Sequence, residues 1–270
     1  MKMRRSRVLE KLRAGQVAGC LKMNLSDPRV VDIAAASGID CVWVDMEHVP
    51  SDYRDIENQV RAAKVFDVDA IVRVCKGSYS DLIRPLELDA TGIMVPHLMS
   101  AEEARRIAWQ TRFHPIGRRP LDGGNADGAY CAIPIADYLR DANAERMVIV
   151  QIEDPEPLAE LDAIAAVEGI DMIFFGPGDF SQGIGRPGDF SAPEIDQARR
   201  QVAEAARRHG KFAGTVGSIE TLPRLVEMGY QFVNVGADVL ALSDAFRRAA
   251  AGVGQPMGEA PSSIYGRGKT

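Results

Sequence analysis

Residues 147–154 read MVIVQIED and residues 172–179 read MIFFGPGD. Each stretch is an apolar run that gives way abruptly to charged residues or glycine. A strand in a parallel sheet is covered by helices on both faces, and it therefore reads as a continuous apolar run instead of an alternating one. The two stretches thus predict parallel strands at 147–152 and 172–175, each followed by polar residues at its carboxyl end.

The same pattern recurs along the chain, with helix-period segments between the apolar runs. Residues 101–109 follow Ser100, a favoured helix N-cap, and residues 193–209 end before Gly210, a favoured C-cap. Strands and helices therefore alternate. The eight predicted strands cover residues 19–23, 40–46, 70–74, 92–96, 147–152, 172–175, 212–216 and 232–235.

Eight β-then-α units in about 250 residues match the size and order of a (β/α)8 barrel, with a doubly wound open sheet as the alternative. We expect one barrel domain over residues 1–251, including an N-terminal helix at 8–17. The proline- and serine-containing segment 252–270 is predicted to be a flexible tail. The glycine- and proline-rich segment 112–129 is long enough to be either functional or disordered.

The composition of the chain limits the kinds of molecule that it could bind. The chain has 270 residues and a formal net charge of -6, which argues against a nucleic-acid-binding protein. No apolar run reaches the roughly 18 residues of a membrane span. The four cysteines show no CxxC spacing and are expected to be reduced. We therefore predict a cytoplasmic protein that acts on small molecules and binds neither nucleic acid nor membrane.

Charged residues at the carboxyl ends of barrel strands are candidates for catalysis, because active sites of such barrels lie at that end. Glu153 and Asp179 follow the neighbouring strands five and six, so a barrel would place them on one side of its mouth. Two carboxylates with no thiolate make a hard oxygen site, which favours Mg²⁺ or Mn²⁺. Each carboxylate alone could instead be a helix cap.

Strand two ends in Asp45, Glu47 and His48, and strand three contains Arg73. His48 could be a general base, a metal ligand or a surface side chain. Asp45 could orient its imidazole or a water. Arg73 could stabilise a developing enolate oxygen, or could simply form a salt bridge within the acidic mouth.

Two further features leave alternatives open. The turn Gly176-Pro177-Gly178 could aim backbone N–H groups at a substrate carboxylate, or could be an ordinary turn between strand and helix. Lys76, just past strand three, could form a Schiff base with a ketone, which is the metal-free route to the same chemistry. Lys22, late in strand one, has a similar but weaker claim.

Several of these segments occur together as motifs. They are VDMEH at 44–48, VRV at 72–74, GIMVP at 92–96, QIE at 151–153 and FGPGDFS at 175–181. In this order and spacing, from about residue 19 to about residue 250, the sequence resembles the HpcH/HpaI family of metal-dependent 2-oxo-acid aldolases. The resemblance implies a barrel of the phosphoenolpyruvate/pyruvate-domain type, assembled as a hexamer of three dimers and binding Mg²⁺, Mn²⁺ or Co²⁺.

The resemblance also implies an activity, the cleavage or formation of 4-hydroxy-2-oxo acids from pyruvate and an aldehyde through a pyruvate enolate. Glu153 and Asp179 would bind the metal. Arg73 would contact the pyruvate keto oxygen, while His48 with Asp45 would transfer a proton.

The backbone N–H groups of Gly178 and Asp179 would hold the pyruvate carboxylate, and we also expect Gln151 and Glu47 to contact the substrate. Two other functions remain open. One is an acyl-CoA lyase of the citrate-lyase β or malyl-CoA type, and the other is a binding barrel without turnover.

Overall fold

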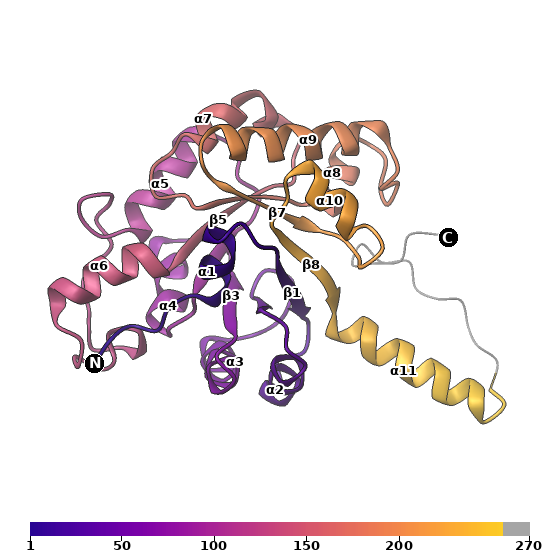
Figure 1. Cartoon of the computed structure of the whole chain (residues 1–270), viewed down its shortest axis with the longest axis horizontal. Coiled ribbons are helices and arrows are strands. Elements are labelled where there is room, and N and C mark those ends of the chain that lie inside the picture. Colours follow the sequence, from indigo (N-terminus) through magenta and orange to yellow (C-terminus); the bar gives the residue numbers. More distant parts are fainter. Residues whose placement is uncertain (256–270) are drawn as a thin grey trace.

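Eight parallel strands close into a barrel in which each strand pairs with its neighbours in sequence and β8 pairs with β1 (Figure 1). The computed structural model describes residues 1–255. The closed ring confirms the predicted (β/α)8 barrel and excludes the open doubly wound sheet. The strands are β1 (Ala18–Met23), β2 (Cys41–Asp45), β3 (Asp69–Arg73), β4 (Gly92–Val95), β5 (Met147–Ile152), β6 (Met172–Phe175), β7 (Phe212–Val216) and β8 (Phe232–Ala237).

Helices surround the strands as an outer layer (Figure 1). Several begin at side chains suited to capping: Asp27 accepts the N–H of Arg29 at the start of α2, and Ser100 accepts that of Glu103 at the start of α5. The helices are α1 (Arg7–Arg13), α2 (Pro28–Ala36), α3 (Tyr53–Val65), α4 (Tyr79–Glu87), α5 (Ala101–Thr111), η1 (Ala126–Gly128), α6 (Ile135–Glu145), η2 (Glu156–Glu160), α7 (Leu161–Ala165), α8 (Pro177–Gly183), α9 (Pro193–Arg208), α10 (Leu222–Met228) and α11 (Asp238–Gly252).

The barrel interior is apolar in its middle and becomes charged toward the carboxyl ends of the strands. Trp43, Phe174 and Phe232 meet edge to face inside it, with ring centroids 5.6 and 6.3 Å apart. Because side chains two residues apart on a strand share a face, Asp45 enters the interior directly after Trp43 along β2. The buried carboxylate of Asp45 therefore lies next to these aromatic side chains, toward the carboxyl ends of the strands.

The predicted and observed boundaries agree closely. Strands β5, β6 and β7 have the bounds that the sequence predicts, and β8 is longer at its carboxyl end. The N-terminal helix is shorter than the predicted 8–17, because α1 ends at Arg13 and Gly15 adopts a left-handed φ of 73°. A helix cannot continue through that conformation. The predicted flexible tail lies outside the described residues from position 256 onward, and residue 252 is the last residue of α11.

Segment 112–129 follows a defined path. Arg119 forms a buried ion pair with Asp127 at 2.8 Å, and the Tyr138 hydroxyl donates to the same carboxylate at 2.7 Å. At Gly117 an added Cβ would lie 2.5 Å from the Arg112 carbonyl oxygen, so only glycine fits this close approach. These contacts fix the segment beside α6.

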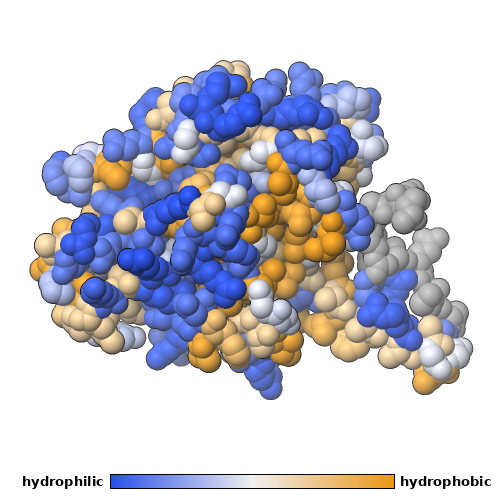
Figure 2. Space-filling view, viewed as in Figure 1, coloured by the Kyte–Doolittle hydropathy of each residue, from blue (hydrophilic) through white to orange (hydrophobic). Residues whose placement is uncertain are grey.

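Helix α11 departs from the regular barrel plan. Its first turn is tied to the end of β1, because Asp238 accepts the N–H groups of Asn24 and Leu25 at 2.9 Å. Beyond that turn the helix projects away from the barrel (Figure 1), and Figure 2 shows apolar surface over β8 and β1 in the same view. Leu21 and Val235, on these two strands, are only partly buried. Within residues 1–255, no helix combines the length and apolarity needed to cross a bilayer.

Candidate active site

Asp45 is the buried anchor of the polar layer at the barrel mouth. Parallel pairing sets it beside Arg73, its register partner on β3. Arg73 donates to it from Nε at 2.9 Å and from Nη2 at 2.6 Å, and Lys22 Nζ lies 2.9 Å away. Burial alone would raise the pKa of Asp45, but the hydrogen bonds and charges of Arg73 and Lys22 outweigh it and hold that pKa well below its usual range.

Arg73 is fixed on several sides. Besides Asp45, its Nη1 contacts Glu47 Oε2 at 2.8 Å, and its guanidinium carbon lies 4.8 Å from the centre of the Trp43 ring. A planar guanidinium held by a two-point contact keeps a defined direction, which a lysine ammonium would not. The mouth therefore contains a buried, permanent positive charge in a defined orientation.

Glu153 follows β5 and is 2% exposed. Its Oε1 accepts the backbone N–H of His97 at 2.8 Å, and its Oε2 accepts from Gln151 Nε2 at 3.2 Å. Burial raises the pKa of Glu153 to about 7, against the lowering effects of His97 and Arg73. A carboxyl in this state would be stabilised as an anion by a nearby cation.

Gly176, the residue that follows β6, lies too close to Glu153 for a larger residue to fit. A Cβ at this position would lie 2.6 Å from Glu153 Oε2 and 2.8 Å from Glu153 Cβ. The glycine therefore lets the start of α8 pack directly on the Glu153 carboxylate. The carboxylate-binding role predicted for the turn that contains Gly176 stays a prediction.

His97 is the functional candidate that sequence reasoning missed, since it lies directly after the predicted strand at 92–96 and was given no role. Its Nδ1 lies 2.8 Å from Asp154 Oδ2. Its Nε2 lies 3.7 Å from Glu47 Oε1 and 3.9 Å from Glu153 Oε1. Glu47, His97 and Glu153 each offer one donor atom, and these atoms lie within 4.8 Å of one another. The adjacency of strands four and five was the signal that could have found it.

The other predicted residues lie around this cluster. Asp179 stands exposed in the first turn of α8 and is not one of the three clustered residues. The His48 side chain is 55% exposed, with Nε2 3.6 Å from Glu47 Oε2. Gln151 is buried, and its Oε1 has no hydrogen-bond partner within the described chain. The structure thus links Asp45, Arg73 and Glu47 in one set of contacts and Gln151 with Glu153 in a second, with His97 between the two sets and His48 at the outer edge.

The two lysines weighed as Schiff-base candidates are both engaged. Lys22 is buried, paired with Asp45, and lies 5.5 Å from the centre of the Trp43 ring. Lys76 lies at the rim, where it donates to the His97 carbonyl oxygen and pairs with Glu103 at 3.0 Å. Lys22 balances the buried charge of Asp45 inside the mouth, and Lys76 holds the backbone of His97 at its rim.

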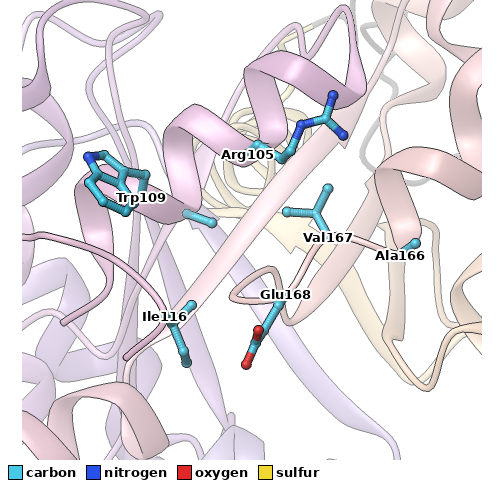
Figure 3. A pocket seen from close by; sticks show the side chains of 7 residues that line it. Arg105, Trp109, Ile116, Ala166, Val167 and Glu168 are labelled. Atoms are coloured by element: carbon cyan, nitrogen blue, oxygen red, sulfur yellow. The ribbon is translucent and has the colours of Figure 1, made fainter. Parts of the chain in front are cut away.

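A cavity of about 330 Å³ lies elsewhere, between α5 and the segment that precedes β6 (Figure 3). Trp109 and Arg105 come to it from α5, while Val167 and Glu168 come from the amino side of β6. The charged cluster is at the opposite, carboxyl end of the strands. This cavity therefore does not belong to the candidate active site.

Comparison with known proteins decides the family. Residues 20–245 match the family model described as HpcH/HpaI aldolase/citrate lyase. The chain belongs to this family. The resemblance seen in the sequence motifs is thereby confirmed.

Two curated relatives and one solved structure that are similar to the chain are named as aldolases. The chain is 34% identical over 264 residues to a hydroxypyruvate/pyruvate aldolase of Pseudomonas aeruginosa, with 97% of this chain and 98% of the relative covered. It is 32% identical to a 2-keto-3-deoxy-L-rhamnonate aldolase of Klebsiella pneumoniae, covering 81% and 82% of the two chains. An HpcH/HpaI aldolase from Desulfitobacterium hafniense has a similar structure, with a TM-score of 0.86, 29% identity, and coverage of 94% and 98%.

The names of these HpcH/HpaI relatives test the predicted class of function. The chain is a carbon–carbon lyase of the aldolase type, as the sequence predicts. The acyl-CoA lyase and the non-catalytic barrel are not favoured by these relatives. Membership of a class II aldolase family also implies a divalent metal, and the donor atoms of the three-residue cluster lie close enough together to hold one.

Proposed function

We propose that this chain is a divalent-metal-dependent aldolase that cleaves or forms 4-hydroxy-2-oxo acids through a pyruvate enolate. One observation carries the proposal: the donor atoms of Glu47, His97 and Glu153 converge beside the buried guanidinium of Arg73. Such a site can bind a cation and can also stabilise negative charge on a neighbouring oxygen. An aldolase that forms an enolate needs both capacities.

The metal would be Mg²⁺, Mn²⁺ or Co²⁺, held by Glu153 and Asp179 as the family resemblance implies. The residues fit a cation, because the donor atoms of Glu47, His97 and Glu153 lie within 4.8 Å of one another and two of them belong to carboxylates. When bound, the ion supplies Lewis-acid charge at the substrate oxygens. Asp179 is exposed in the first turn of α8, three residues after Gly176, so an ion can reach it from solvent.

The fixed side chains would divide the remaining work. Arg73, oriented by Asp45 and Glu47, would stabilise the developing enolate oxygen of pyruvate. Gln151, whose buried Oε1 has no partner within residues 1–255, would contact the substrate from inside the mouth. Glu47 would contact it from the rim, next to His48.

Proton transfer would fall to His48. It is solvent-exposed at the rim and would take the C4 hydroxyl proton on cleavage, a role that contributes about 10²- to 10⁴-fold. Asp45 is bound to Arg73 and Lys22, so we propose that it assists mainly by holding Arg73 in place. The backbone N–H groups of Gly178 and Asp179 would bind the pyruvate carboxylate.

We also propose that the chain works as a homo-oligomer in the cytoplasm, with the hexamer as the assembly that the resemblance implies. Support comes from α11, which carries the exposed apolar side chains Leu242 and Phe246, the latter 68% exposed. The outer surfaces of β1 and β8 leave Leu21 and Val235 partly uncovered. A second copy could cover both surfaces, since exposed apolar areas of this kind commonly mark interfaces.

A panel assay tests the proposed function. Chain dialysed against EDTA is incubated with pyruvate and a series of aldehydes, and 4-hydroxy-2-oxo acid is measured before and after addition of Mg²⁺, Mn²⁺ or Co²⁺. Activity should require metal and should be abolished in Glu153→Ala, while Glu168→Ala, at the distant cavity, should match the unaltered chain. Full activity in excess EDTA would contradict the metal-dependent proposal and favour Lys76.

A further inference from the structure

The imidazole of His97 is held in place from several directions. Its backbone has a left-handed φ of 48°, an arrangement that is unfavourable for a non-glycine residue and persists where surrounding contacts determine it. Those contacts are present: the N–H donates to Glu153, the carbonyl accepts from Lys76, and Nδ1 meets Asp154 Oδ2 at 2.8 Å. The other ring nitrogen, Nε2, is therefore directed at Glu47 and Glu153.

This arrangement matches the way in which proteins orient a histidine that binds metal. A ligating histidine donates its second ring N–H to a carboxylate, which fixes the tautomer and turns the opposite lone pair toward the ion. Here Asp154 occupies the position of that carboxylate. With Nδ1–H directed to Asp154, a neutral ring would present a lone pair at Nε2.

The distances from Nε2 favour a shared ion over a direct hydrogen bond. Nε2 lies 3.7 Å from Glu47 Oε1 and 3.9 Å from Glu153 Oε1, beyond hydrogen-bond range. Two donors that each lie about 2.1 Å from one ion stand roughly 3.0 to 4.2 Å apart, depending on the angle between them. Both observed separations fall inside that interval.

The charges around the ring also favour a cation. Three carboxylates, those of Glu47, Glu153 and Asp154, face the imidazole. Of the neighbouring cations, Arg73 contacts Glu47 through the other carboxylate oxygen, Oε2, and Lys76 contacts the His97 carbonyl oxygen. The space between Nε2 and the two glutamates is thus bordered by one nitrogen donor and two oxygen donors.

We propose that His97 Nε2 is a nitrogen ligand of the divalent ion, alongside Glu153, and that Asp154 is the positioning residue that orients it. The inference rests on the proposed metal-dependent function and adds a ligand which neither the sequence motifs nor the family assignment supplies. It has a consequence for metal choice. An imidazole nitrogen binds first-row transition ions better than Mg²⁺, which prefers oxygen, and binds Co²⁺ better than Mn²⁺, so His97 should favour Co²⁺ most and Mg²⁺ least.

Pulsed electron paramagnetic resonance of the full chain loaded with Mn²⁺ tests this directly. With ¹⁵N-labelled histidine, the unaltered chain should show a manganese–nitrogen coupling of the size expected for a directly bound imidazole. The coupling should persist in His48→Gln, the matched control at the rim, and should disappear in His97→Gln. Because the decisive spectrum comes from the unaltered chain, it does not depend on the folding of any variant.

Metal affinity gives a second readout. Asp154→Asn should weaken Mn²⁺ binding about 10- to 100-fold, the usual range for loss of an orienting partner, and His97→Gln, which removes the ligand itself, should weaken it at least as much. Both variants should weaken Mg²⁺ binding less. Mn²⁺ bound in a Glu153-dependent manner without nitrogen coupling would overturn the role of His97 and leave the proposed function intact. Mn²⁺ binding unaffected by Glu153→Gln would overturn the proposed metal site itself.

Discussion

Arg73 donates two hydrogen bonds to Asp45, from Nε to Oδ1 at 2.9 Å and from Nη2 to Oδ2 at 2.6 Å, between neighbouring strands β3 and β2. The pair is buried, and Lys22 and Glu47 extend it on either side. A two-point contact of this kind fixes the plane of the guanidinium as well as its position. Arg73 thus enters the mouth in a preset orientation, which is the property that stabilisation of an enolate oxygen requires.

Arg73→Lys should reduce kcat for aldol cleavage by about 10²- to 10³-fold, the usual effect of removing one preorganised donor. A lysine keeps the charge but cannot contact Asp45 at two points and Glu47 at the same time. Steady-state kinetics measure the effect, with Arg61→Lys on the exposed face of α3 as the control. If Arg73→Lys keeps essentially the kcat of the unaltered chain, the orientation of the guanidinium is unimportant.

Glu153 should make the metal-free chain less stable as the pH rises. Its folded pKa of about 7 lies above the ordinary value of 4.5, so between these values the folded chain holds a proton that the unfolded chain releases. The contribution of this group to the free energy of unfolding therefore falls through that window, by up to about 3 kcal/mol.

The comparison of Glu153→Gln with the unaltered chain isolates this effect. Both are unfolded in EDTA at pH 5 and at pH 8, and the variant, which has no proton to lose at this position, should gain relative stability at the higher pH. Glu168→Gln, exposed at the distant cavity, serves as the matched control. A stability difference between Glu153→Gln and the unaltered chain that stays constant with pH would rule the effect out.

Gly176→Ala should weaken metal binding about tenfold or more, because its Cβ would lie 2.6 Å from Glu153 Oε2 and would displace that carboxylate. Calorimetric titration with Mn²⁺ measures the change. Gly252→Ala is the control, since a Cβ there meets nothing within 4 Å. Equal affinity in Gly176→Ala and the unaltered chain would mean that Glu153 does not hold the ion.

Phe246→Asp should shift the chain from oligomer to smaller species in light scattering coupled to size-exclusion chromatography. Its ring is 68% exposed on the projecting helix α11, so a charge there should disfavour an apolar interface while leaving the barrel folded. Ile135→Asp, on α6, tests whether any exposed apolar residue has this effect. If Phe246→Asp keeps the parental mass, α11 is not the contact.

The barrel was predictable because its strands are covered on both faces. The runs at 147–152 and 172–175 contain almost no polar residues. Parallel strands tolerate such runs because neither face of the sheet is exposed to water. The end of α1 was less predictable, since the turn at Gly15 interrupts a pattern that still looks amphipathic. The extension of β8 through Gly236 was missed because glycine weakens a strand signal.

The candidate site was predictable at the level of strand ends but not of contacts. The position of Glu153 after β5 follows from the apolar run before it. The contacts of Asp45 with Lys22 and Arg73 depend on which strand residues point inward, and on the register between three strands. The position of His97 depends on a left-handed backbone conformation that no sequence pattern announces.

Exchange of the pyruvate methyl protons for deuterium, followed by NMR, tests the central claim most directly, because it detects the enolate without any aldehyde. The chain with Mg²⁺ should catalyse exchange, EDTA should stop it, and Glu153→Gln should be inactive with metal present. Exchange that continues unchanged in EDTA, or no exchange with Mg²⁺, Mn²⁺ or Co²⁺, would contradict a metal-dependent pyruvate enolate.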